Sequence, residues 1–172
     1  MSVNTAILDL FLARGHLRAE ISTRGFSRIS DVLNNAPGDF LTGTLIQIGG
    51  TEAGLDGLRS VQPRELVVRL NDVLLVQPVE ERAPTQGSAT DERRSRLAQR
   101  MVIELGEWEV RGALHLVDPI PWVDFVTFSA NRFVPVTRGS IRAPGAHQPT
   151  DSPFLLVNGS RISALYEERP DD

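Results

Sequence analysis

The histidines are the first residues of this sequence whose chemistry could serve catalysis or bind a metal. There are three, His16, His115 and His147, and no two of them have the four-residue spacing that places two ligands on one helix face. Alternation along the predicted strands puts His16 and His115 on the polar side of the sheet. We therefore interpret them as surface histidines and predict neither a metal site nor a bound cofactor.

Two aspartates form the other candidate pair. Asp31 and Asp124 each stand nine residues before a phenylalanine, Phe40 and Phe133. Paired carboxylates can act as general acid and general base, but an aspartate near the start of a helix also stabilises that helix through its dipole. We interpret both aspartates as structural and predict no catalytic residue, which leaves an enzyme using this carboxylate pair as an alternative hypothesis.

The composition excludes several kinds of chemistry. The chain of 172 residues has no cysteine, and all 18 of its basic residues are arginine. Disulfides, thiolate nucleophiles, lysine Schiff bases and P-loop lysines are therefore excluded. The net charge of -4 argues against a protein that binds nucleic acid mainly by neutralising phosphates, although a local arginine patch stays compatible with it.

The distribution of apolar residues bears on location. No apolar run approaches the roughly 18 residues of a membrane span, and the amino terminus lacks the early basic region of a secretion signal. We expect a cytoplasmic protein without membrane insertion, ending in an acidic tail at residues 170–172.

The elements that must position these residues are organised by a repeat. Arg14-Gly15-His16-Leu17 returns ninety-seven residues later as Arg111-Gly112-Ala113-Leu114, and residues 68–76 match residues 157–165 in the pattern of apolar positions. Three matches in the same order, including the two aspartates, predict an internal duplication. We expect Gly15 and Gly112 to be structural, allowing a sharp bend or a close backbone approach in each copy.

The apolar periodicity predicts a mainly β protein made of two related small β units, packed with pseudo-twofold symmetry. Each unit has the order strand, strand, short helix, strand, strand. We place the units at residues 1–79 and 98–169, joined by a polar linker at residues 80–97 whose last part could form a brief helix over residues 90–101. The predicted elements are strands at residues 6–12, 15–21, 40–48 and 66–76, a serine-capped helix at residues 29–35, a strand at residues 102–117 bent at Gly106, an irregular aromatic segment at residues 119–128, and strands at residues 132–141 and 154–166.

The order of these motifs resembles an uncharacterised bacterial β-rich domain family known only as a domain of unknown function. The resemblance rests on Arg14-Gly15-His16-Leu17, on Ser30-Asp31-Val32-Leu33-Asn34, on Phe40-Leu41 and on residues 66–76, and it covers both copies. It implies a fold and no mechanism, because the family carries no accepted activity.

A second resemblance is to Sm-like proteins, small bent barrels that assemble into rings and often bind single-stranded RNA. Residues 66–76 and residues 154–165 are similar to the second Sm motif, a hydrophobic strand, a polar turn and another hydrophobic strand. This resemblance implies a nucleic-acid binder that uses arginines such as Arg69 and Arg161.

The aromatic residues suggest where a partner would bind. Trp122 and Phe125 replace the helix face of the first copy, and tryptophan and arginine are enriched at interaction hot spots. Unpaired strand edges in duplicated units also favour self-association or strand addition by a partner. The sequence therefore predicts a non-enzymatic binding or assembly protein whose partner is a protein or a second copy, with single-stranded nucleic acid as the alternative.

Overall fold

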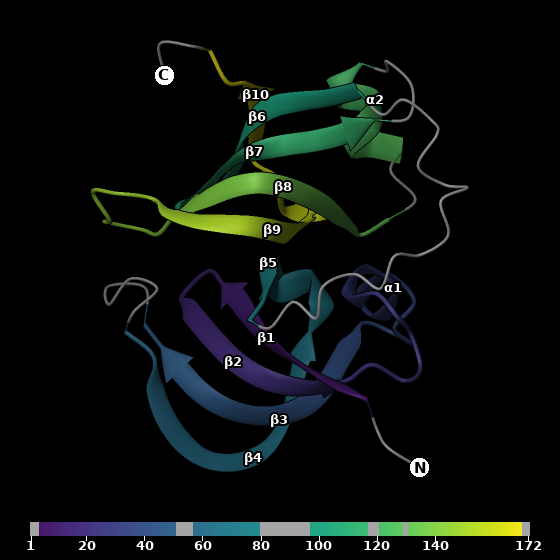
Figure 1. Ribbon diagram of the computed structural model, residues 1–172, viewed down its shortest axis with the longest axis vertical. Coiled ribbons are helices and arrows are strands. Elements are labelled where there is room, and N and C mark those ends of the chain that lie inside the picture. The colour runs from purple at the N-terminus through teal and green to yellow at the C-terminus, as the bar shows by residue number, and fades with distance from the viewer. Residues whose placement is uncertain (1–3, 51–56, 80–96, 117–120, 129–130, 170–172) are drawn as a thin grey trace.

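The computed structural model describes residues 4–50, 57–79, 97–116, 121–128 and 131–169. The chain forms two small, strongly curved β units stacked along the long axis of the molecule (Figure 1). Of the predicted linker at residues 80–97, residues 80–96 lie outside the described residues, as does the acidic tail at residues 170–172. Among those residues, no helix has both the length and the apolar character needed to cross a bilayer.

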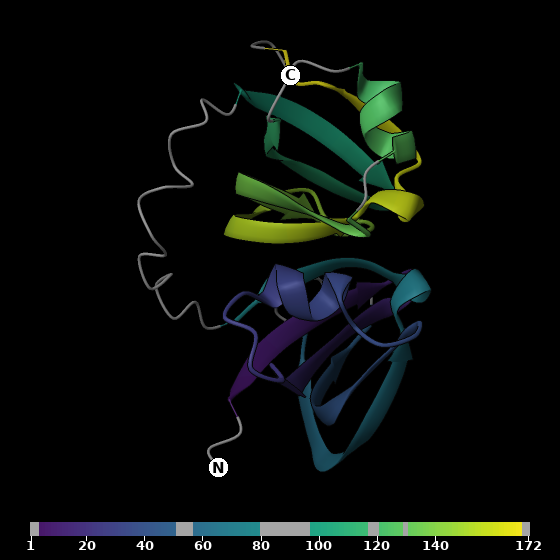
Figure 2. The same cartoon turned by 90° about the vertical axis from the view of Figure 1, so that its right-hand side faces the viewer.

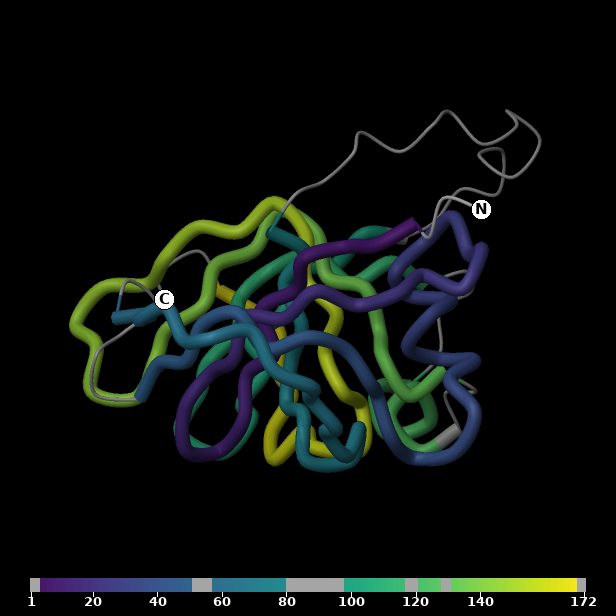
Figure 3. The backbone as a smooth tube through the Cα atoms, turned by 90° about the horizontal axis from the view of Figure 1, so that it is seen from below, coloured from purple at the N-terminus to yellow at the C-terminus, as the bar shows by residue number. Residues whose placement is uncertain are grey.

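The two units share one order of elements. The first unit contains β1 (Thr5–Leu12), β2 (Gly15–Ser22), α1 (Ile29–Asn34), β3 (Phe40–Gly49), β4 (Arg59–Arg69), the 3₁₀ helix η2 (Leu70–Asp72) and β5 (Val73–Pro78). The second unit contains β6 (Leu97–Leu105), β7 (Trp108–Leu116), α2 (Trp122–Phe128), β8 (Phe133–Arg142), β9 (Thr150–Asn158), the 3₁₀ helix η3 (Gly159–Arg161) and β10 (Ala164–Glu167). The mainly β class is confirmed. A view along the long axis shows the strands of both units curling, with α1 and α2 on the same side (Figure 3).

One antiparallel sheet runs through both units in the order β10-β6-β7-β8-β9-β5-β1-β2-β3-β4. The fifth strand of the first unit, β5, pairs with the fourth strand of the second unit, β9. A twofold axis would bring like strands together, so the predicted pseudo-twofold packing is wrong: the units are joined head to tail. The sheet consequently ends on two unlike strands, β4 and β10.

The strand registers define which positions correspond between the units. Phe40 pairs with Arg69 in the first unit as Phe133 pairs with Asn158 in the second. Phe40 and Phe133 are separated by 93 residues. The same separation relates Arg18 to Arg111, which face Gln47 and Ser140 respectively. The shared order is what a duplication would produce, and duplication stays our prediction.

The glycines of the repeated motif occupy different places in their hairpins. Gly15 opens β2 and faces Leu12 across the turn, whereas Gly112 lies within β7 opposite Met101. The alignment of the two Arg-Gly pairs must therefore be shifted by four residues, which brings Arg111 onto Arg18.

Three element predictions are corrected by the structure. Residues 122–128, predicted to be irregular, form α2, because Trp122, Phe125 and Val126 follow helical spacing and the backbone of Pro121 accepts the first amides. Residues 97–101, predicted to be helical, begin β6. The predicted bent strand at residues 102–117 is two strands in its described part, residues 102–116, because Gly106, at φ +66°, supplies a left-handed turn between them.

Two further boundaries also differ from the prediction. The predicted strand at residues 66–76 is interrupted by η2, whose Leu70 is fully buried. The helix α1 begins after Arg28 without the predicted serine cap.

Candidate functional site: the unit junction and the free sheet edges

The junction between the units is built first by strand pairing. Leu75 of β5 lies opposite Val157 of β9, and Val76 lies opposite Leu156. The pairing is short, so side chains must supply most of the contact. The ribbon views show β5 and β9 meeting at the middle of the molecule, between the two curved units (Figures 1 and 2).

Side chains of each unit complete the core of the other. Phe133 and Leu156 of the second unit belong to the core cluster of the first unit, and both are 0% exposed. Phe11, Leu74 and Leu75 of the first unit belong to the core cluster of the second. This reciprocal insertion stabilises the junction by apolar burial, at roughly 25 cal/mol for each Å² removed from water.

Hydrogen bonds, partly buried at Asn34 and fully buried at Asn158, fix the position of the inserted side chains. The amide of Asn34 in α1 donates to the backbone oxygen of Phe133 at 3.1 Å and accepts from its backbone nitrogen at 2.8 Å. The side chain of Asn158, fully buried, donates to the carbonyls of Leu70 and Val73 at 3.1 and 2.8 Å. These carbonyls lie in and beside η2, so Asn158 ties the end of β9 to the first unit.

An aromatic row crosses the same junction. Trp108 meets Phe11 edge to face at 5.1 Å and donates its indole N–H to the carbonyl of Leu12 at 3.2 Å. His16 also stacks on Phe11, with ring centroids 5.2 Å apart.

The prediction that His16 lies on the surface is wrong. Its side chain is 1% exposed, and neither ring nitrogen has a hydrogen-bond partner. It lies directly opposite Phe11 in the β1–β2 register and therefore shares the face that points into the junction. Burial lowers the pKa of His16, an effect that nearby Asp9 opposes and Arg18 reinforces. The neutral imidazole is the form that the fold favours.

The other two histidines lie in different elements, β7 and the β8–β9 loop. His115 is partly buried and shares a 2.7 Å hydrogen bond with the hydroxyl of Thr137, and His147 is exposed in the loop before β9. In the described part of the chain, no group of three or more acidic or histidine side chains could hold a metal ion.

Asp31 and Asp124 occupy the first turns of α1 and α2. Two shallow clefts lie at the junction, of about 420 and 540 Å³, and neither is lined by Asp31 or Asp124. Arg161 lines the larger cleft together with Arg14.

The outer edge at β4 exposes positions that are buried at the junction. Phe40 is 47% exposed and Val67 is 57% exposed. Their counterparts by register are Phe133 and Leu156, the two fully buried residues that complete the first unit's core. The guanidinium of Arg69 lies over the ring of Phe40, 5.5 Å from its centroid. The sequence predicts a strand that begins at Phe40 but not the exposure of this side chain, because the exposure depends on which unit ends the sheet.

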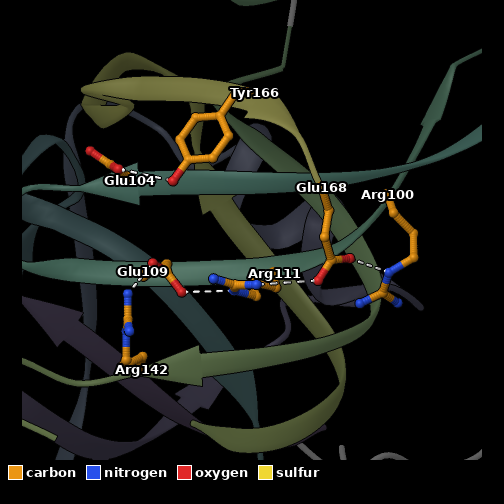
Figure 4. A network of polar contacts seen from close by, with 7 residues as sticks. All are labelled: Arg100, Glu104, Glu109, Arg111, Arg142, Tyr166 and Glu168. Carbon is orange, nitrogen blue, oxygen red and sulfur yellow. Dashed lines mark hydrogen bonds and ion pairs between the residues drawn. The ribbon is translucent and has the colours of Figure 1, made fainter. Parts of the chain in front are cut away.

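The outer edge at β10 is held by a charged network, drawn in Figure 4. Arg111 bridges Glu109 at 2.9 Å and Glu168 at 3.6 Å. Arg100 also pairs with Glu168, and Arg142 with Glu109. The hydrogen bond from Arg100 is the main cause that lowers the pKa of Glu168. The network fastens the segment after β10 to β6 and β7.

The predicted hot-spot aromatics lie beside that edge. Trp122 and Phe125 meet edge to face at 5.9 Å and are partly buried against the second unit's core. Val123 of α2 is 69% exposed.

The glycine of the first motif has a clear structural role. Gly15 has φ +147°, and a Cβ there would lie 2.4 Å from the carbonyl oxygen of Gly49. In the second unit, a Cβ on Gly112 would lie 2.5 Å from Cγ1 of Val136. Both positions require the close approach that only glycine permits.

Comparison of the chain with protein-family models, with curated proteins and with solved structures gave no match.

Proposed function

We propose that the chain is a non-enzymatic binding or assembly protein that engages another polypeptide along the outer edges of its sheet. The observation that carries this proposal is the exposed apolar pair Phe40 and Val67 at the open edge of β4. An edge strand presents unpaired backbone groups to a partner, and exposed apolar side chains beside it add affinity and select the partner.

The charge and shape of β4 support a localised binding segment. Its first half carries Arg59, Pro63 and Arg64, and its register with β3 shifts between Leu45 and Gln47. Proline, charge and bulges are the devices that protect an edge strand from unwanted pairing. The second half, residues 65–69, pairs regularly with β3 and contains three consecutive apolar residues, Leu66, Val67 and Val68. The protected part of the edge thus gives way to an apolar part.

A photo-crosslinking side chain at position 67 tests this proposal in the cells that express the protein. We expect a covalent adduct with a polypeptide, and none from a matched probe at the exposed His147 in the β8–β9 loop. The adduct is analysed by mass spectrometry, so that its identity is known. Absence of any polypeptide adduct at position 67 would reject edge binding.

Single-stranded nucleic acid is the second candidate, supported by the position of Arg69 over the exposed ring of Phe40. Bases stack on aromatic and guanidinium planes with little sequence preference. Fluorescence polarisation of a labelled oligonucleotide at low salt tests it. Binding that is weakened by both Arg69→Ala and Phe40→Ala would favour this candidate, whereas no binding to the wild-type chain would reject it.

A further inference from the structure

The junction within the chain defines two complementary faces. We call Phe133 and Leu156, with the β9 edge, the inserting face. We call the β5 edge and the surrounding core residues the receiving face: its apolar members are Val32, Leu33, Leu70, Val73 and Val76. All members of both faces are buried because each covers the other.

The first unit carries a second inserting face that is uncovered. Phe40 and Val67 occupy the positions of Phe133 and Leu156, since Thr42 pairs with Val67 as Pro135 pairs with Leu156. The backbone edge of β4 beside them has no strand partner among the described residues. Both side chains are apolar, as in the covered face, yet about half exposed.

The second unit carries a second receiving face that is also uncovered. In the second unit, Leu165 of β10 pairs with Ile103 of β6. In the first unit, Val76 of β5 pairs with Leu10 of β1, the counterpart of Ile103. Leu165 therefore corresponds to Val76, and β10 corresponds to β5. Phe125, Ile162 and Leu165 occupy the positions of Val32, Val73 and Val76. These three are only partly buried, whereas their first-unit counterparts are 4%, 0% and 0% exposed.

We propose that the occupant of these two faces is a second copy of this chain, whose β10 pairs antiparallel with β4. This proposal rests on the proposed function and names the partner of the same edge. Within the chain, Val76 faces Leu156 and Leu75 faces Val157 across the junction. The same register between two copies places Leu165 of one copy opposite Val67 of the next. It also places Ala164 opposite Val68. Phe40 then enters the space between α2 and β10, beside Phe125.

Arg69 takes the role of Asn158 in this assembly. Asn158 donates to the carbonyls of Leu70 and Val73 within the chain. The corresponding carbonyls on the receiving face of a second copy belong to Gly159 and Ile162. A guanidinium has five N–H donors and no acceptor, so Arg69 satisfies both carbonyls while its plane stays against Phe40.

The contact is heterologous, so each added copy leaves one inserting face and one receiving face open. Such contacts close into rings when the rotation between units permits and otherwise extend into filaments. The mass in solution should therefore exceed that of a single chain and should increase with concentration until closure or saturation.

Cysteine pairing tests the register directly, because the native chain contains no cysteine. Chains carrying only Val67→Cys are mixed with chains carrying only Leu165→Cys under mild oxidation. We expect a disulfide-linked pair made of one chain of each kind, and little linkage within either chain type alone. Val68→Cys with Ala164→Cys repeats the test at the neighbouring pair, should Leu165→Cys disturb the second unit.

The mass of the unmodified chain gives the second measurement. Light scattering of the unmodified chain should give a mass that is a multiple of the single-chain mass. The Val67→Lys variant should have the mass of a single chain. Phe26→Lys, at a 39% exposed position in the loop before α1, is the control and should leave the mass unchanged.

The outcomes separate this proposal from the broader function. A single-chain mass at every concentration, with no mixed disulfide, would overturn assembly with a second copy. If the photo-crosslink at position 67 then captures a different protein, edge binding still stands; if it captures nothing, both fail. Disulfides between two Val67→Cys chains, in place of mixed ones, would replace the head-to-tail register with a twofold one.

Discussion

Phe40 and Phe133 begin corresponding strands and face corresponding partners, yet Phe40 is 47% exposed and Phe133 is fully buried. The difference arises from position in the sheet. Phe133 stands where the second unit meets the first, and Phe40 stands where the sheet ends. The pair therefore offers a matched comparison of one residue type in two environments.

Phe133→Ala should lower the free energy of unfolding by about 3–5 kcal/mol, the usual cost of removing a buried phenylalanine. Phe40→Ala should change it by no more than about 0.5 kcal/mol in the single chain, as for an exposed position. Urea unfolding of both variants checks this, at a protein concentration low enough to disfavour association. Equal losses would contradict the assignment of Phe133 to the first unit's core.

Asn158→Ala should destabilise the junction by about 1–3 kcal/mol, because the buried carbonyls of Leu70 and Val73 lose their donors. The control is Asn35→Ala, whose side chain donates to the carbonyl of Asp31 at an exposed site. Thermal unfolding gives the comparison. A midpoint for Asn158→Ala as high as that of the control would show that water satisfies these carbonyls.

His16 should make stability depend on pH. Its pKa in the folded chain lies below the ordinary value of 6.5, so the unfolded chain binds the proton more readily. The free energy of unfolding should be greatest above pH 6.5 and decrease as the pH falls from 6.5 through the folded-state pKa. In the His16→Phe variant, the free energy of unfolding should no longer depend on pH in this range. In the His147→Gln variant, the dependence should remain. A pH dependence that is the same in all three chains would exclude His16 as its source.

Glu168→Gln should loosen β10. The carboxylate pairs with Arg100 and Arg111, and its pKa is lowered in the folded chain. Its contribution is therefore present above the ordinary value of 4.5 and lost as the pH falls through the lowered value. Hydrogen exchange of the amides of Ala164–Glu167 should be faster at neutral pH in the variant. Glu20→Gln, at an exposed position of β2, should leave this exchange unchanged.

Gly15→Ala should destabilise the first hairpin by about 1–3 kcal/mol, because φ +147° is strained for alanine and the new methyl group would meet the carbonyl of Gly49. Gly50→Ala is the control, since a Cβ there has nothing within 4 Å. The unfolding midpoints of the two variants check this. A lower midpoint for Gly15→Ala than for Gly50→Ala would show that position 15 requires glycine.

Local patterns predicted the class of the fold and much of its order. Alternation identified β1, β2 and β3, and the spacing of Ile29, Val32 and Leu33 identified α1. The second helix was missed because its aromatic residues suggested an irregular segment, although Trp122 and Phe125 are spaced to share one helical face. The turn at Gly106 was mistaken for a bend because both flanking stretches are strand-like.

The candidate site could not be predicted from local pattern, because it depends on contacts between units. Alternation assigned His16 to the polar side, but near the junction both faces of the first hairpin are covered. Phe40 and Phe133 look alike in the sequence, and only the order of strands in the sheet separates the exposed one from the buried one.

The reciprocal exchange of core side chains between the units has a consequence for how the chain unfolds. The first unit's core is incomplete without Phe133 and Leu156, and the second unit's core is incomplete without Phe11, Leu74 and Leu75. Neither half retains its full apolar contacts once the other has opened. Despite its two curved units, the chain should therefore melt in one cooperative transition, as a single thermodynamic domain.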